Sequence, residues 1–140
     1  MKAAERERFR EWIRNLVTKL KSYFYLDGWN IDIFWDKDMD GTPDAGPGVC
    51  PVYMVSNDAY LHAALTYTPY AEELWEEGHK DKLIHTTVHE FSHILTRPMF
   101  DYAEKLASKP ELPFLLVMNE RAAEMVANVI QRGIPDDFIS

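Results

Sequence analysis

The chain has 140 residues, a formal net charge of −8 and a single cysteine. Hydrophobic residues make up 46% and charged residues 27% of it, as in an ordinary globular domain, so we expect one domain over residues 1–140. The acidic balance argues against nucleic-acid binding, because neutralising phosphates requires clustered Lys and Arg. One cysteine excludes an internal disulfide and a cysteine-rich zinc site.

The sequence shows no targeting or membrane segment. The stretch from Met1 to Arg14 is charged throughout, unlike a signal peptide. No apolar run approaches the roughly 20 residues that a membrane span requires. We therefore expect a cytoplasmic protein without a membrane partner.

The first half of the chain predicts one helix and a small sheet. Apolar residues recur at helical spacing over residues 3–24, which predicts an amphipathic helix. Alternating apolar and polar residues predict strands over residues 29–36 and 61–68. A short strand over residues 49–55 contains Pro51, which would confine it to an edge or make it irregular.

The second half predicts helices. A short helix over residues 70–77 is followed by a longer one over 80–96, which Pro98 would end. A further short helix is expected over residues 100–108 and a long one over 114–131, before a tail over 134–140. The fold class is therefore α+β, with an antiparallel or mixed sheet of about three strands.

The helix over residues 80–96 carries His89-Glu90-Phe91-Ser92-His93, an H-E-x-x-H motif. Residues four apart share one face of a helix, so His89 and His93 can point at one metal ion. Glu90 is rotated from them by about 100 degrees and can reach a water on that metal as a general base. Zinc hydrolysis requires this layout, so we predict a zinc site. His85, one turn before His89, could support it, although lone helical histidines are usually structural or solvated.

A catalytic zinc site requires a third protein ligand. No histidine follows His93, so a downstream ligand must be a carboxylate; His62, on a strand before the motif, is a less economical alternative. Glu120 and Glu124 lie four residues apart in an apolar helix, where like charges are unfavourable without a partner. We predict that Glu120 binds zinc and that Glu124 accepts a hydrogen bond from a ligand imidazole. The alternative is two solvated glutamates on an exposed stripe.

Together with Asn119-Glu120-Arg121-Ala122-Ala123-Glu124, the H-E-x-x-H motif makes the chain resemble a minimal gluzincin metallopeptidase. The second motif is similar to the thermolysin-like pattern, in which the first Glu binds zinc and a later acidic residue orients a histidine. That later residue is Glu124 here, where the pattern has Asp. The size and order of elements are similar to small zincin-like proteins of bacteria and phages, and to metallopeptidases that cleave phage repressors or act in the radiation response. The resemblance covers roughly residues 83–131 and implies a zincin-like fold and a peptide or protein substrate.

The resemblance implies a hydrolytic mechanism in which Glu90 takes a proton from zinc-bound water and the resulting hydroxide attacks a peptide carbonyl. Glu90 then passes the proton to the leaving amine. The candidate electrophiles for the oxyanion are Tyr67, His85, Arg97 and Tyr102. The strand over residues 61–68 is a candidate sheet edge that would pair with an extended substrate. The alternative function is a zinc-binding regulatory or interaction module without turnover.

Residues 36–44 read D-x-D-x-D-G-x-x-D, the spacing of a calcium loop, with Asp36, Asp38, Asp40 and Asp44 as candidate Ca²⁺ ligands. The Glu that an EF-hand requires at its last loop position is replaced by Pro47. The loop is more similar to the shorter aspartate-rich calcium loops of extracellular repeat proteins. A solvated acidic hairpin tip is the other interpretation, and the false-positive rate of short motifs favours it.

Overall fold

A computed structural model describes residues 1–36 and 50–139 and shows an α+β fold in them. Its helices are α1 (Ala3–Tyr23), α2 (Pro69–Glu76), α3 (Lys80–Leu106) and α4 (Leu112–Gly133), and its strands are β1 (Asn30–Trp35), β2 (Val52–Asn57) and β3 (His62–Tyr67). Short 3₁₀ turns lie at Asp58–Tyr60 and Lys109–Glu111. The predicted α+β class and the small mixed sheet of three strands are confirmed. Among the described helices, none has the length and apolar character to cross a membrane.

The three strands form a mixed sheet in the order β1-β3-β2. β1 runs parallel to β3, and β2 pairs with β3 antiparallel. Because β3 has a neighbour on both sides, the prediction that residues 61–68 form a sheet edge is wrong. β1 and β2 are the two edge strands of this sheet. β2 begins directly after Pro51, where a residue without an amide proton interrupts no ladder.

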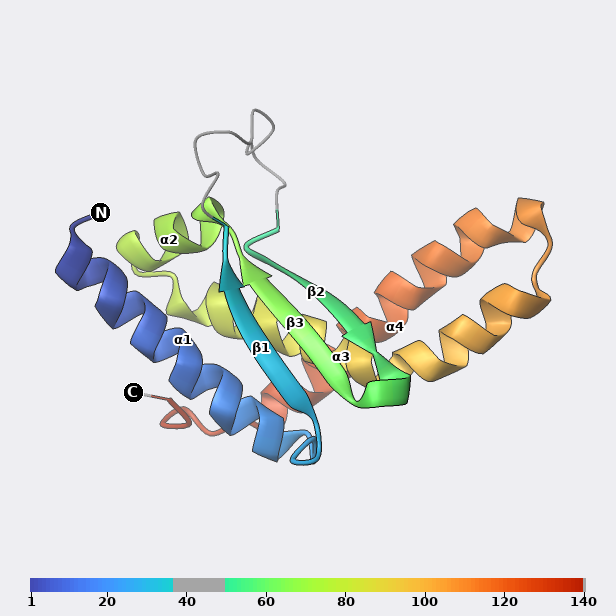
Figure 1. Cartoon of the computed structure of the whole chain (residues 1–140), viewed down its shortest axis with the longest axis horizontal. Coiled ribbons are helices and arrows are strands. Elements are labelled where there is room, and N and C mark those ends of the chain that lie inside the picture. The colour runs from blue at the N-terminus through green and yellow to red at the C-terminus, as the bar shows by residue number, and fades with distance from the viewer. Residues whose placement is uncertain (37–49, 140) are drawn as a thin grey trace.

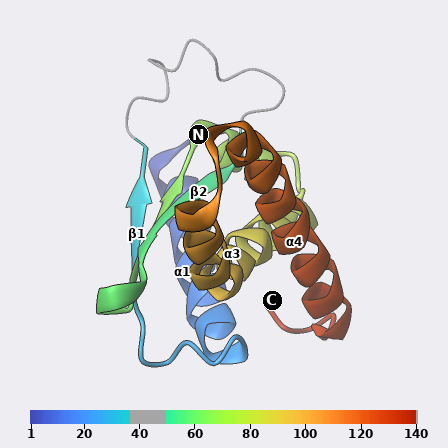
Figure 2. The same cartoon turned by 90° about the vertical axis from the view of Figure 1, so that its right-hand side faces the viewer.

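Helices α1, α3 and α4 lie on one side of the sheet (Figures 1 and 2). Exposure alternates along β3, so that Ala63, Leu65 and Tyr67 are buried against the helices. The apolar stripe predicted on α1 faces the same core, where Phe9, Ile13, Leu16 and Leu20 are fully buried. Burial of this stripe fixes α1 as a scaffold helix on the sheet.

The C-terminal segment is tied to α1. Phe138 and Ile139 are partly buried against the core, and the Phe138 ring lies 5.5 Å from that of Tyr23. Lys19 Nζ also donates a hydrogen bond of 2.7 Å to the Phe138 carbonyl. The residues predicted as a tail are therefore anchored where the structure describes them.

Helix α3 continues through Pro98 to Leu106, so the predicted end before Pro98 and the separate helix over residues 100–108 are wrong. A proline inside a helix removes one hydrogen bond, here to the Ile94 carbonyl, and its ring crowds that group. The residues on either side keep the helical turn: Arg97 Nε and Asp101 Oδ2, four residues apart, form an ion pair of 3.4 Å across the proline. The penalty is local and does not end the helix.

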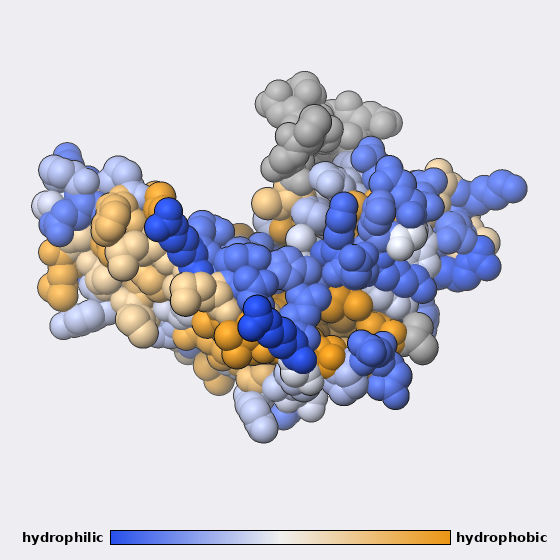
Figure 3. Space-filling view, turned by 180° about the vertical axis from the view of Figure 1, so that it is seen from behind, coloured by the Kyte–Doolittle hydropathy of each residue, from blue (hydrophilic) through white to orange (hydrophobic). Residues whose placement is uncertain are grey.

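The second half of α3 and the first half of α4 form a hairpin that projects beyond the sheet, here called the arm (Figure 1). Several large apolar side chains on it are exposed, among them Met99, Tyr102, Leu106 and Phe114. Figure 3 shows apolar residues gathered on the arm, at the left of the view. The arm therefore adds surface to the molecule without adding to its buried core.

Replacing Pro98 by Ala should raise the free energy of unfolding by about 1–3 kcal/mol, since the new amide can donate to Ile94 and the exposed proline ring has no packing to lose. Urea denaturation measures the change. Pro113→Ala is the matched control, because Pro113 lies in the first turn of α4, where its amide would have no helical partner. A Pro98→Ala variant no more stable than wild type would contradict a continuous α3.

Candidate metal centre

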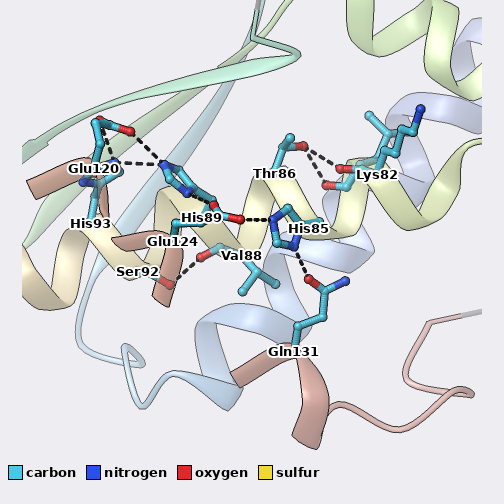
Figure 4. A network of polar contacts seen from close by, with 11 residues as sticks. Lys82, His85, Thr86, Val88, His89, Ser92, His93, Glu120, Glu124 and Gln131 are labelled. Atoms are coloured by element: carbon cyan, nitrogen blue, oxygen red, sulfur yellow. Dashed lines mark hydrogen bonds and ion pairs between the residues drawn. The ribbon is translucent and has the colours of Figure 1, made fainter. Parts of the chain in front are cut away.

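The three predicted ligands converge between α3 and α4 (Figure 4). The Nε2 atoms of His89 and His93 lie 3.2 Å apart. Glu120 places Oε2 3.2 Å from Nε2 of His89 and Oε1 3.2 Å from Nε2 of His93. With one donor atom taken from each residue, the three atoms lie within 4.8 Å of one another.

These residues fit a zinc ion. Tetrahedral zinc with bonds of about 2.0–2.1 Å holds neighbouring donor atoms about 3.3 Å apart, close to the separations of 3.2 Å around His89. Two histidines and a glutamate are also the donor set of known catalytic zinc sites that keep one position open. The histidine side chains are only 17% and 14% exposed, while that of Glu120 is 65% exposed, so the centre opens on its Glu120 side.

Glu124 lies beside His89, as predicted, but it has a second partner. Its Oε2 accepts a hydrogen bond of 2.7 Å from Nδ1 of His89, and its Oε1 accepts one of 2.7 Å from Nε2 of His85. Nδ1 of His85 in turn donates to Oε1 of Gln131 (Figure 4). Because Nδ1 of His89 donates to a carboxylate, the lone pair of its ring is left on Nε2, which faces Glu120 and His93.

Charges in the centre favour a neutral His93 and an ionised Glu124. Burial lowers the pKa of His93, although the charge of Glu120 opposes this, and His89 acts in the same direction as burial. Slight burial works against the charge of Glu124, but hydrogen bonds from His85 and His89 outweigh it and lower the pKa of Glu124. Burial works to lower the pKa of His85, but its hydrogen bonds to Gln131 and Glu124 and the charge of Glu124 outweigh burial and raise that pKa. A neutral His93, which can offer a nitrogen lone pair, and an ionised Glu124, which holds His89, suit metal binding.

Glu90 lies in a cavity of about 400 Å³ that His93, Glu120 and Arg97 also line. Burial raises the pKa of Glu90 to about 7; the charge of His89 opposes this shift and that of Glu120 adds to it. A carboxyl that titrates near neutrality can both accept and return a proton. The predicted base is therefore beside the donor group and tuned for proton transfer.

Of the four candidate electrophiles, Arg97 lines this cavity. Tyr67 is buried, its hydroxyl bonds Thr87 Oγ1 at 2.8 Å, and burial raises its pKa, so it is sequestered in the core. Tyr102 is 66% exposed on the arm, and His85 is committed to Glu124. Sequence reasoning missed Tyr53 of β2, which lines the cavity and could have been found only from the strand order.

The remaining predicted residues lie elsewhere. His62 pairs with Asp32 at 2.8 Å instead of joining the three donors. Asp38, Asp40 and Asp44 of the calcium motif lie outside the described residues, so that prediction stands as it was. Cys50 is exposed; partial desolvation and the charges of Glu90 and Glu120 raise the pKa of its thiol, which keeps it protonated.

The chain matches no protein-family model, no curated protein and no solved structure.

Glu90→Gln should change how the stability of the metal-free protein depends on pH. The folded pKa of Glu90, about 7, lies above its ordinary value of 4.5, so the folded state binds the proton more tightly than the unfolded chain. The free energy of unfolding of the wild type therefore falls as the pH rises from 4.5 to about 7. The variant lacks this loss and should be more stable than wild type above that range, by up to about 3 kcal/mol.

Urea denaturation of both proteins in the presence of a chelator, on either side of this pH range, measures the difference. Other titrating groups are common to the two proteins and largely cancel. A stability difference that stays constant with pH would contradict a buried Glu90 with a raised pKa.

Proposed function

We propose that the protein is a zinc-dependent metallopeptidase of the gluzincin type with a zincin-like fold. The observation that carries the proposal is the convergence of His89, His93 and Glu120 on one point, with Glu90 beside them in an open cavity. We place it in the cytoplasm, since one unpaired cysteine suits a reducing compartment.

In this proposal His89, His93 and Glu120 hold the zinc ion. When bound, zinc would polarise the substrate carbonyl and lower the pKa of a coordinated water to about 7. The nearby cation would favour the carboxylate form of Glu90 at neutral pH. Glu90 then accepts a proton from the attacking water and returns it to the leaving amine. Partial burial keeps the Glu90 side chain in place beside the donors and limits competing water.

The substrate would lie between β2 and the arm. β2 is one of the two edge strands of the sheet, and its residues Tyr53 and Met54 line the cavity that holds Glu90. An edge strand presents unpaired backbone groups, which an extended peptide can bind. Arg97, on the opposite wall, can approach the developing oxyanion, and its ion pair with Asp101 holds it on the side of α3 that faces the cavity.

The wild-type protein should bind one zinc ion and cleave an unstructured protein such as casein. Glu90→Gln should keep the zinc and lose cleavage by at least about 100-fold, because general-base catalysis is removed. His93→Ala and Glu120→Ala should lose the zinc, since a ligand is removed. Metal analysis and a peptide-release assay measure both effects.

Glu104→Gln is the matched control, because Glu104 lines the same cavity but is not one of the three donors. It should keep both zinc and activity. Full activity in Glu90→Gln would sink the mechanism. Tight zinc binding without turnover in the wild type would favour the alternative, a zinc-binding regulatory or interaction module.

A further inference from the structure

A series of hydrogen-bonded side chains leads away from the three candidate zinc ligands along the contact between α3 and α4. It runs from His89 through Glu124 and His85 to Gln131, alternating between the two helices (Figure 4). His85 and His89 lie one turn apart on α3, while Glu124 and Gln131 lie two turns apart on α4. This spacing lets the His85 ring fit between the two α4 side chains.

This series of hydrogen-bonded side chains restricts rotation of the Glu124 carboxylate. Its side chain is 44% exposed, so water could satisfy its oxygens, yet each oxygen is taken by a different imidazole at 2.7 Å. Both ring nitrogens of His85 face side-chain oxygens, and the protonated ring can donate to both of them. A carboxylate held on one side by His85 cannot rotate without breaking its bond to His89.

His85 and Gln131 lie away from the substrate region of the proposed function. They line a separate cavity of about 520 Å³, whereas Glu90 and His93 line the one beside β2. A role for His85 in touching the substrate is therefore disfavoured, and an effect on the metal through Glu124 is favoured.

We propose that His85 and Gln131 are positioning residues that lock the Glu124 carboxylate, so that Glu124 fixes His89 in its Nδ1–H tautomer and leaves Nε2 for the metal. The part of this inference that concerns zinc rests on the proposed function. The part that concerns the His89 tautomer does not need the metal. Partners behind a ligand imidazole set its tautomer and orientation, and their loss typically weakens metal binding about 10–100-fold.

Two substitutions of similar size separate positioning from packing. The amide nitrogen of Gln can take the place of the His85 Nε2 donor toward Glu124, whereas Asn is too short and reaches only the Nδ1 place. His85→Asn should weaken zinc affinity by about 10-fold, and His85→Gln should stay within about 3-fold of wild type. Competition with a chromophoric chelator measures both affinities, and thermal melting shows that the variants fold.

The same substitution in a Glu124→Ala variant is the second test. If His85 acts through Glu124, His85→Asn should cause no further loss of zinc affinity once Glu124 is removed. Equal losses for His85→Gln and His85→Asn, no loss in either, or an undiminished effect in the Glu124→Ala background would each overturn the proposal.

The tautomer is read in the metal-free protein from the ¹⁵N shifts of the His89 ring at alkaline pH. The wild type and His85→Gln should show the Nδ1–H form, and His85→Asn a mixture of both forms. An unchanged tautomer in His85→Asn would overturn the proposal. A wild type that binds no zinc would defeat the proposed function, while the tautomer would still decide the positioning role.

If His85→Asn does not fold, Gln131→Met removes the far acceptor alone. It should weaken zinc affinity about 3-fold and loosen the His89 tautomer, by the same mechanism. If neither zinc affinity nor the His89 tautomer changed, the proposed positioning role of His85 and Gln131 would be overturned.

Discussion

The close contact between α3 and α4 is the constraint on which the centre depends. Ala123 and Ala127 are the α4 residues that are buried, and Leu83, Val88 and Phe91 are among those buried on α3. Small side chains at a helix contact let the two axes approach closely. Glu120 and Glu124 flank this alanine seam, and the approach brings their carboxylates within 2.7–3.2 Å of the imidazoles of α3. Larger side chains at positions 123 or 127 would push the two helices apart and separate the Glu120 and Glu124 carboxylates from the imidazoles of α3.

The centre holds carboxyl groups with opposite electrostatic environments. Glu90 has lost water, and its pKa rises toward 7, whereas hydrogen bonds from two histidines outweigh burial and lower the pKa of Glu124. One group is suited to exchanging a proton and the other to staying charged. The separation follows from position: Glu90 is rotated off the histidine face toward the sheet side, while Glu124 sits behind His89 on the neighbouring helix.

The sheet and the arm shape what surrounds this chemistry. Antiparallel pairing puts β2 outside β3, and the edge strand thereby becomes one wall of the cavity at Glu90. The continuation of α3 through Pro98 adds Asp101 and Glu104 to the lining of this cavity, and the arm would not exist if the helix ended at Pro98. Pro98 removes one hydrogen bond from α3, and the helix continues on both sides of it.

The sequence by itself determined the local geometry: the stripe of α1, the shared face of His89 and His93, the offset of Glu90, and, from the absence of any later histidine, a carboxylate as the downstream candidate ligand. These follow from the helical period, which fixes neighbours within about four residues. Only the tertiary structure decided which strands form the edges of the sheet, that Tyr53 lines the cavity, and that Glu124 accepts hydrogen bonds from two histidines and connects through His85 to Gln131. Those contacts join segments far apart in the chain, and their pairing is set by which surfaces bury together, which no local pattern records.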